Sequence, residues 1–362
     1  MKKKILFVIP SLEGGGAERV IVNLLRNIDR TKFNVNFIAI NLQGPYVKDL
    51  PNDINIIDLK KTRARYSIFK LIKEINKIKP DSILTTLGFI NILLIIIKPF
   101  LFGKPRIVIR EANTVSKNFS GTSNLKKSIY KSIYSYLYPK ADVIIAQSEG
   151  MKNDLINFLS LPPNKIKRIY NPIDINTIIS KSKEFNPFMH NGVQNIVSIG
   201  RLTYQKGFDI LIEAFKVVVD HNPNTKLTIL GEGPLKKELL DLADNLGIIN
   251  NINFEGFKEN PYPYLSNSDV FVLSSRWEGF PNVLLEALAC GSNIVSTNCK
   301  SGPSEIIGDN KYGLLVEEEN AELLAQNIIN MLKKAPQTKQ NMDQSLIYDI
   351  KNIVTQYEDI LI

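Results

Sequence analysis

Short apolar runs alternate with longer amphipathic stretches along most of this chain. The runs are Ile5–Ile9, Ile83–Thr86, Ile107–Ile109, Val143–Ala146, Ile196–Ile199, Leu227–Leu230 and Val270–Leu273. Between them, apolar residues recur with the period near 3.6 that is typical of helices. Continuous apolar runs indicate strands that are buried on both faces, as in parallel sheets covered by crossover helices. The pattern therefore predicts the α/β class.

The alternation occurs twice, which predicts two domains. The length of 362 residues agrees, because a single hydrophobic core stops growing below this size. We expect an N-terminal Rossmann-like domain at 1–172, a linker at 173–194, a C-terminal Rossmann-like domain at 195–339, and a helix at 340–362 that returns toward the first domain. In doubly wound domains that face each other across a central cleft, ligands bind at the carboxyl ends of the strands.

Charge is divided unevenly between the two halves of the chain. Residues 1–170 carry 29 Lys or Arg against 12 Asp or Glu, a net charge of +17, whereas residues 171–362 carry 16 against 24, a net charge of −8. Such asymmetry indicates that the first half faces a polyanion. The basic cluster at 60–65 precedes the apolar and basic segment 68–78, and the cluster at 126–131 leads into Tyr134, Tyr136 and Tyr138. Basic residues that alternate with Ile, Leu and Tyr in this way favour an anionic membrane over nucleic acid. The alternative is a solvated face whose tyrosines pack inward.

Few residues are suited to a metal site or to disulfide bonds. Cys290 and Cys299 are nine positions apart, which fits neither arrangement and agrees with a reducing cytoplasm. His190 and His221 are the only histidines, so a histidine metal cluster is excluded. The apolar run Leu87–Phe102 is interrupted by polar residues and is too short to span a membrane, so we expect a core helix there.

A glycine loop follows the first predicted strand and opens a helix. Gly14, Gly15 and Gly16 let backbone amides approach a ligand, and the helix N-terminus favours an anion. Phosphate is therefore the predicted ligand of this loop. Arg19 stands where a dinucleotide fingerprint requires glycine or alanine, which disfavours NAD. A tight turn without a ligand is the alternative interpretation.

Two later strand-to-helix segments carry charged residues. The first places Arg201 and Lys206 five residues apart beyond a buried strand, where both cations can converge on one diphosphate. The second follows Val270–Leu273 and carries Glu278 in a loop and Glu286 on a helix, eight positions later. The two carboxylates can therefore reach different parts of a single ligand.

These motifs resemble those of glycosyltransferase family 4. Glu278 and Glu286 match the family's E-x7-E pattern. Residues 200–207 match its phosphate-binding segment, and residues 15–19 match its first glycine loop. The order and placement of the motifs agree over roughly residues 1–335. The resemblance implies a GT-B fold and a retaining hexosyltransferase that uses a nucleotide sugar.

The resemblance also implies roles for individual residues. Arg201 and Lys206 would hold the diphosphate, Glu278 would orient the sugar, and Glu286 would accept hydrogen bonds from the ribose. Of these, Glu278, Arg201 and Lys206 are the catalytic candidates. The implied donor-binding set is Gly15, Gly16, Arg201, Lys206, Gly231, Phe257, Glu278, Gly279, Phe280, Pro281, Asn282, Val283, Leu284 and Glu286. Many relatives place a histidine near 111–113, and the acceptor-side candidates here are Glu18, Arg19, Glu111 and Asn113.

We expect neither a cofactor nor a metal. The chain has no Asp-x-Asp pair, with which metal-dependent transferases of the other major fold hold a cation, so Arg201 and Lys206 are expected to replace it. The expected partners are a nucleotide-sugar donor, UDP-linked by analogy, a lipid-linked glycan acceptor and an anionic membrane surface, but no nucleic acid. They place the protein in the cytoplasm, peripheral on the inner face of the cell membrane. A soluble acceptor, a nucleotide-sugar epimerase on the same fold and a non-catalytic sugar-binding subunit are the alternatives.

Overall fold

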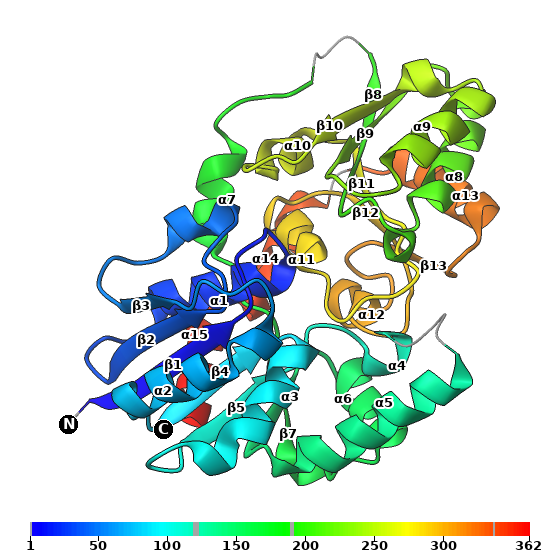
Figure 1. Ribbon diagram of the computed structural model, residues 1–362. Helices are drawn as coiled ribbons and strands as arrows, with labels where there is room; N and C mark the ends of the chain where they lie inside the picture. Colours follow the sequence, from blue (N-terminus) through cyan, green and yellow to red (C-terminus); the bar gives the residue numbers. More distant parts are fainter. Residues whose placement is uncertain (1, 119–122, 189–191, 336) are drawn as a thin grey trace. The chain divides into compact units, whose positions relative to one another are not determined.

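The chain folds into two α/β units (Figure 1). This computed structural model describes residues 2–118, 123–188, 192–335 and 337–362, so His190 lies outside the described residues. Unit 1 comprises Met1–Ile173 with Ile350–Ile362, and unit 2 comprises Asp174–Asp349. The chain therefore passes from one unit to the other twice, after Ile173 and after Asp349.

Unit 1 contains a parallel sheet of seven strands in the order β3-β2-β1-β4-β5-β6-β7. Its strands are β1 (Lys3–Ile9), β2 (Phe33–Ala39), β3 (Asn55–Asp58), β4 (Ser82–Thr86), β5 (Arg106–Arg110), β6 (Val143–Ala146) and β7 (Ile166–Arg168). Its α-helices are α1 (Gly16–Asn27), α2 (Ile68–Ile78), α3 (Gly88–Ile97), α4 (Val115–Asn118), α5 (Asn124–Leu137), α6 (Glu149–Leu159) and α15 (Ile350–Leu361).

Unit 2 contains a parallel sheet of six strands in the order β10-β9-β8-β11-β12-β13. Its strands are β8 (Gln194–Ile199), β9 (Thr225–Leu230), β10 (Ile252–Gly256), β11 (Val270–Leu273), β12 (Ile294–Thr297) and β13 (Leu314–Val316). Its α-helices are α7 (Ile175–Ser182), α8 (Phe208–His221), α9 (Lys236–Asn245), α10 (Tyr262–Asn267), α11 (Asn282–Ala289), α12 (Pro303–Ile307), α13 (Ala321–Leu332) and α14 (Thr338–Ser345). The predicted α/β class with two parallel Rossmann-like sheets is confirmed.

Helices cover both faces of the unit 1 sheet, and this explains the continuous apolar runs. Apolar residues of α2, α3 and α6 form one core with the sheet, and those of α1 and α15 form a second core on its other face. The expected core helix at Leu87–Phe102 is α3, followed by the short 3-10 helix η3 (Lys98–Phe100). None of the helices described here is long and apolar enough to cross a membrane.

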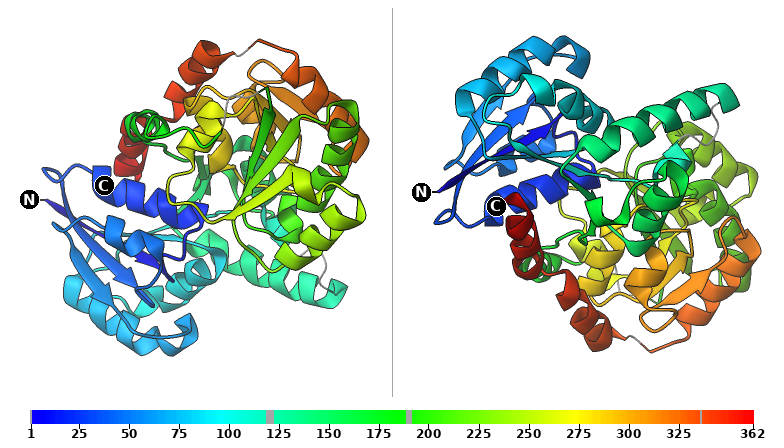
Figure 2. Two further views of the ribbon diagram at one scale, coloured as in Figure 1. Left: turned by 90° about the horizontal axis from the view of Figure 1, so that it is seen from above. Right: turned by 90° about the horizontal axis from the view of Figure 1, so that it is seen from below.

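The last helix of the chain packs into unit 1. Figure 2 shows α15 beside α1, and these two helices are in contact. The amide of Ile350 donates to the carbonyl of Ile173 at 2.9 Å. Glu358 accepts from the amide of Asp29 at 2.8 Å and pairs with Lys32 at 3.1 Å. Residues 340–349 of the expected returning segment belong instead to unit 2.

The segment expected as a linker contains α7. Asp174 caps this helix by accepting from the amide of Thr177 at 3.0 Å, and Ile175 and Ile178 on it are buried. Helix α7 packs against α10 and α11 within unit 2. The first part of the expected linker is therefore a helix that packs within unit 2, because its apolar residues recur at helical spacing.

A buried polar network lies at the carboxyl end of β5 in unit 1. Arg110 is fully buried and donates to Thr86 at 3.0 Å and to Asn171 at 2.6 Å. The neighbouring Glu111 is 2% exposed and accepts from Asn91 at 3.0 Å and from the hydroxyl of Tyr138. Burial raises the pKa of Glu111 to about 7, although both hydrogen bonds and the charge of Arg110 oppose this shift.

The raised pKa of Glu111 predicts a pH-dependent stability. The folded state keeps its proton up to about pH 7, whereas an exposed glutamate releases it near its ordinary pKa of 4.5. The folded state therefore binds more protons between these values, so the free energy of unfolding falls as the pH rises through this window. The loss approaches about 3 kcal/mol above pH 7. Glu111→Gln keeps an acceptor for Tyr138 and cannot ionise.

The measurement is urea unfolding of both proteins at pH 5 and pH 8. We expect the Glu111→Gln variant to gain about 2 to 3 kcal/mol relative to the original chain between pH 5 and pH 8. All other titrating groups are common to the two proteins, so the difference isolates Glu111. Equal pH dependence in both proteins would contradict the prediction.

Candidate active site

The sheet order of unit 2 places a switch point between β8 and β11. Strand numbering runs outward from β8 through β9 to β10 on one side, and from β11 through β12 to β13 on the other. In such sheets, the loops that leave the two central strands separate and form a binding site at their carboxyl ends. The loops at this position are 200–207 and 274–281, which carry the predicted site residues Arg201, Lys206 and Glu278.

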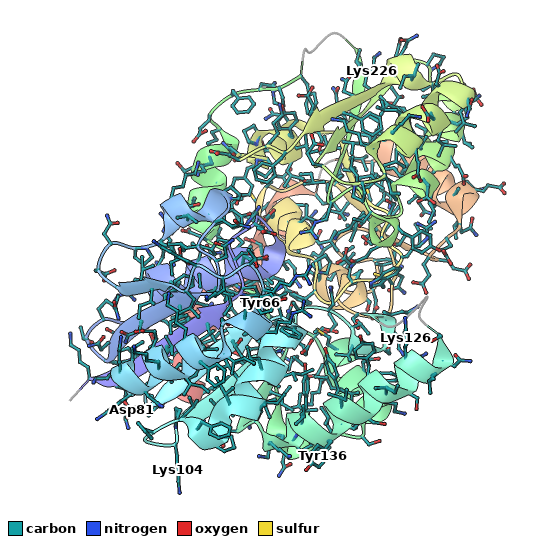
Figure 3. All side chains as sticks on the ribbon, viewed as in Figure 1. Tyr66, Asp81, Lys104, Lys126, Tyr136 and Lys226 are labelled. Carbon is teal, nitrogen blue, oxygen red and sulfur yellow. The ribbon has the colours of Figure 1, made fainter. Side chains whose placement is uncertain are left out.

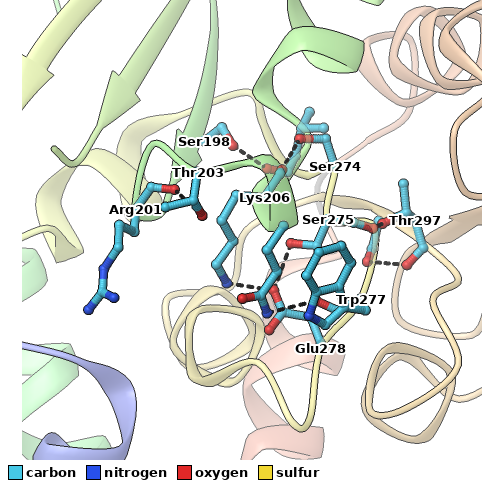
Figure 4. A network of polar contacts seen from close by, with 12 residues as sticks. Ser198, Arg201, Thr203, Lys206, Ser274, Ser275, Trp277, Glu278 and Thr297 are labelled. Carbon is cyan, nitrogen blue, oxygen red and sulfur yellow. Dashed lines mark hydrogen bonds and ion pairs between the residues drawn. The ribbon is translucent and has the colours of Figure 1, made fainter. Parts of the chain in front are cut away.

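Lys206 and Glu278 bridge these two loops (Figure 4). The ammonium of Lys206 lies 2.5 Å from Oε1 of Glu278, and the hydroxyl of Ser275 donates to the same oxygen at 2.6 Å. Glu278 is 5% exposed, and Ser275 is fully buried. A buried carboxylate needs such partners, because removal of one partner leaves its charge uncompensated. The carboxylate is therefore held in one orientation by both loops.

Arg201 takes a different position from Lys206. Its side chain is exposed, and Figure 4 shows it pointing away from the Lys206–Glu278 pair. The structure thus brings Lys206 and Glu278 together, as expected for one site, but does not bring the two cations together.

Gly207 allows the two loops to touch. Its φ of +60° is in the left-handed region, and a Cβ atom there would lie 2.2 Å from the carbonyl oxygen of Ser274. The Ser274 hydroxyl in turn donates to the carbonyl of Lys206 at 2.9 Å. Any larger residue at 207 would push the Lys206 loop away from the Glu278 loop.

Arg276 forms a second clamp between the same loops. Its guanidinium donates to both carboxylate oxygens of Asp209, at 2.9 and 2.6 Å, and its Nε donates to Glu319 at 2.9 Å. The guanidinium also lies 3.9 Å from the ring centroid of Tyr204. Burial alone would raise the pKa of Asp209, but the hydrogen bond and charge of Arg276 lower it. This carboxylate therefore stays charged and holds Arg276.

The backbone adds further contacts between the loops. The amide of Arg276 donates to the carbonyl of Gln205 at 2.8 Å, and the Gln205 side chain donates to the carbonyl of Trp277 at 2.9 Å. Lys206 ends the 3-10 helix η6 (Tyr204–Lys206), so these bonds fix the segment that carries it. Arg276, Asp209 and Ser275 were missed in the sequence. The short spacing between Ser275 and Glu278 was a signal, whereas the partnership of Arg276 with Asp209 spans 67 positions.

Helix α11 presents a mixed set of the predicted donor residues. Pro281 is its N-cap, and Glu286 is 4% exposed. The side chains of Phe280 and Leu284 are also buried, and Phe280 packs edge-on against Tyr348. The start of a helix favours an anion, so the backbone of the first turn can also contribute to binding a ligand. Asn282 and Val283 are partly exposed, whereas Gly279 is buried.

The loops after β9 and β10 adjoin the same edge of the sheet. A Cβ atom on Gly231, whose φ is +137°, would lie 1.9 Å from the carbonyl oxygen of Gly200. The amide of Gly231 donates to the carbonyl of Gly256 at 2.8 Å. Phe257, the next residue, is 46% exposed and lies at the edge of this loop cluster. Gly231 and Phe257 are therefore on loops that are linked by hydrogen bonds.

The other predicted site residues belong to unit 1. Gly15 is the N-cap of α1, and Gly16 is the first residue of that helix. The carboxylate of Glu18 folds back against Gly15, where it would contact any added Cβ atom. Arg19 donates to the hydroxyl of Tyr46 at 2.9 Å.

Glu111 and Asn113 differ in accessibility. Asn113 is partly exposed, whereas Glu111 points into the buried network with Tyr138 and Asn91. Among the residues that the structure describes, no group of three or more His, Cys, Asp or Glu side chains is arranged to hold a metal ion.

Comparison with known proteins identifies the family to which this chain belongs. The model described as "Glycosyltransferase Family 4" matches residues 14–177, and the model "Glycosyl transferases group 1" matches residues 179–348. A Campylobacter jejuni N-acetylgalactosaminyltransferase is 35% identical, over 91% of this chain and 90% of its own length. The chain belongs to glycosyltransferase family 4. It is therefore an enzyme that transfers sugars, as the motifs predicted.

Other family relatives and solved structures agree with this assignment. An amylovoran biosynthesis glycosyltransferase of Erwinia amylovora is 24% identical and aligns over 99% of both chains. The crystal structure of Anabaena HepE in complex with UDP-glucose matches with a TM-score of 0.81 at 20% identity, covering 99% of both chains. Similarity at this identity supports the GT-B fold. The predicted fold class is confirmed.

The Arg276 clamp predicts a loss of activity from a residue that need not touch the substrate. Arg276→Gln removes the paired hydrogen bonds to Asp209 and loosens the Lys206 loop, so we expect kcat/KM for sugar transfer to fall by roughly tenfold or more. Arg276→Lys keeps the charge but lacks the planar fork, so it should restore only part of the activity. The measurement is steady-state kinetics, with thermal unfolding to verify the fold.

Arg168→Gln is the matched control for this prediction. Arg168 pairs with Glu149 at 2.9 Å and stacks on Tyr170, as Arg276 does on its own partners, but it lies in unit 1 at the end of β7. We expect kcat/KM of this variant to stay within about twofold of the original, in line with the small energies of exposed ion pairs. Equal losses in the two glutamine variants would exclude a specific role for the clamp.

Proposed function

We propose that this enzyme transfers a hexose or N-acetylhexosamine from a UDP-sugar to a lipid-linked sugar or oligosaccharide in bacterial glycan synthesis, with retention of anomeric configuration. The observation that carries the donor side is the Lys206–Glu278–Ser275 contact at the switch point of unit 2. It places a cation and an oriented carboxylate at the carboxyl ends of two strands, where such sheets bind nucleotides.

Two comparisons support the choice of substrates. The Campylobacter jejuni relative is named for transfer of N-acetylgalactosamine to a diphospho-undecaprenol-linked saccharide. The Anabaena neighbour was crystallised with UDP-glucose, which makes UDP-sugars the first donors to test. Both statements describe those proteins, and for this chain they support the proposal above.

The proposed chemistry depends on charge that develops on the leaving diphosphate. Lys206 and Arg201 would stabilise this charge, together with backbone amides at the start of α11. Glu278 and Gly279 would orient the sugar, and Glu286 would accept hydrogen bonds from the ribose. Phe257 would border the base. The leaving phosphate would help to take the proton of the acceptor on the same face of the sugar, so a strong protein base is unnecessary.

On the acceptor side, unit 1 carries the remaining candidates. Glu18, Arg19 and Asn113 lie in loops or at a helix start near the carboxyl ends of its strands. The side chain of Glu111 is occupied by its buried partners, which favours a supporting role beneath this surface. A lipid-linked acceptor would place the enzyme on the inner face of the cell membrane as a peripheral protein.

Donor binding can be measured without the acceptor. We expect UDP-sugars, but not GDP- or ADP-sugars, to raise the midpoint of thermal unfolding by several degrees, because a ligand at 100 times its Kd stabilises by about 2.7 kcal/mol. The shift should disappear in Glu286→Ala and persist in Glu213→Ala, which changes an exposed glutamate on α8 of the same unit. If none of the nucleotide sugars raised the midpoint of unfolding, that result would contradict the donor assignment.

The absence of a metal requirement is a separate prediction. Lys206 and Arg201 supply the positive charge that a divalent ion provides elsewhere, so transfer should continue at an unchanged rate in excess EDTA. Lys206→Gln should lower kcat by about 10² or more under the same conditions. Activity that EDTA abolishes and Mg²⁺ or Mn²⁺ restores would show that a metal acts at this site.

A further inference from the structure

Helix α5 presents an apolar stripe to solvent. Leu125, Ile129, Ile133 and Tyr136 follow one another at helical spacing and are 73%, 51%, 39% and 69% exposed. These residues are called the α5 stripe below. A contiguous exposed apolar row of this kind is rare on a surface that faces water alone, and it marks an interaction site.

The inward side of α5 explains why the stripe points outward. The rings of Tyr134 and Tyr138 lie 4.8 Å apart, and Tyr138 is fully buried while Tyr134 packs against the core. The hydroxyl of Ser135 donates to the carbonyl of Leu159 on α6 at 2.7 Å. The helix is thus anchored along one side only. Tyr134 and Tyr138 pack inward as the solvated-face alternative expected, but Tyr136 faces solvent.

Apolar side chains continue from the stripe onto neighbouring helices. Helix α3 packs against both α2 and α5, so the three form one layer over the sheet (Figure 1). Phe69 on α2 is 89% exposed, and Phe100 and Phe102 after α3 are 63% and 65% exposed. Large exposed aromatic residues on the same layer extend the apolar surface beyond a single helix.

The same segment of the chain is strongly basic. Residues 60–140 contain 17 Lys or Arg but only 3 Asp or Glu, and one of these three is the buried Glu111. Lys104 and Tyr136 project outward from unit 1 in Figure 3, and Lys126 is also exposed. The ammonium of Lys140 lies 3.7 Å from the ring centroid of Tyr136, so positive charge directly adjoins the stripe.

We propose that the α5 stripe and the aromatic residues beside it seat on an anionic phospholipid bilayer. Basic side chains would bind lipid headgroups, while Leu, Ile, Phe and Tyr would enter the boundary with the acyl chains. The complementary charge of an anionic leaflet is the feature that selects this occupant. The biological role of this surface rests on the proposed function, because a lipid-linked acceptor would lie in the same membrane.

The apolar stripe also distinguishes a bilayer from a nucleic acid. Nucleic-acid surfaces attract Lys and Arg through phosphates, but they offer no burial site for a row of aliphatic side chains along a helix. A basic surface for nucleic acid would therefore bind through its lysines and be indifferent to the α5 stripe. Removal of the apolar side chains should therefore weaken binding to a bilayer but leave binding to a nucleic acid unchanged.

The test is sedimentation of the full chain with vesicles, without any substrate. We expect binding to vesicles of phosphatidylglycerol and phosphatidylcholine, weak binding to phosphatidylcholine alone, and weakening by salt. Leu125→Gln/Ile129→Gln/Tyr136→Gln should lower the affinity about tenfold or more. Glutamine is a good helix former, so α5 should persist. The control is Val217→Gln/Leu346→Gln, which changes two exposed apolar residues of unit 2.

The basic component is tested in the same assay. Lys126→Gln/Lys140→Gln should weaken binding to the anionic vesicles, whereas Lys226→Gln/Lys237→Gln, with equal loss of charge in unit 2, should change it less than twofold. Vesicle binding that is unchanged in the α5 stripe variant would overturn the proposal. So would equal binding to both vesicle types, or binding of DNA in place of vesicles.

Donor binding separates this proposal from the proposed function. The α5 stripe variant should keep the thermal shift with UDP-sugars, because its substitutions are exposed residues of unit 1. If the protein binds vesicles as expected but binds no nucleotide sugar, the proposed membrane-binding surface is supported and the proposed donor substrate is wrong. If the donor binds but the stripe variant still sediments with vesicles as well as the original does, the membrane surface fails alone.

Discussion

The contact between Lys206 and Glu278 is the interaction on which the candidate active site depends. It joins the loops that leave β8 and β11, the two strands at the switch point of the unit 2 sheet. The sheet order alone would let these loops separate. Gly207 removes the side chain that would keep them apart, and Arg276 ties them together from the other side. Each of these features serves to hold one carboxylate and one cation in place.

Unit 1 has a different physical character. Its polar groups at the end of β5 face inward, where Arg110 and Glu111 are buried with hydrogen-bond partners from several elements. Basic residues of α2 and α5 and large apolar residues of the α2, α3 and α5 layer face outward. The net charges of the two halves thus differ in sign because their charged residues are used differently. The second half pairs carboxylates with cations in the candidate active site, whereas helices α2 and α5 of the first half carry exposed cations.

Much of the fold was predictable because burial on both faces leaves a simple pattern. The strands β1, β4, β5, β6, β8, β9 and β11 were seen as continuous apolar runs, and the parallel arrangement followed from the helices between them. The loop motifs likewise identified Lys206 and Glu278, because the family pattern is local in sequence. Glu111 was less predictable. Its position after β5 suggested the acceptor side, but the direction of its side chain depends on Asn91 and Tyr138, which lie 20 and 27 positions away.

The amino-acid sequence by itself determined the alternation of strands and helices, the order of the motifs and the uneven charge, since these depend on neighbouring residues and on composition. The tertiary structure decided which groups meet. It brought Arg276 to Asp209, turned Glu111 inward, and placed Tyr134 against the core while leaving Tyr136 of the same helix exposed. The physical reason is that side-chain direction and burial depend on how distant elements pack, and a local pattern in the chain does not contain that information.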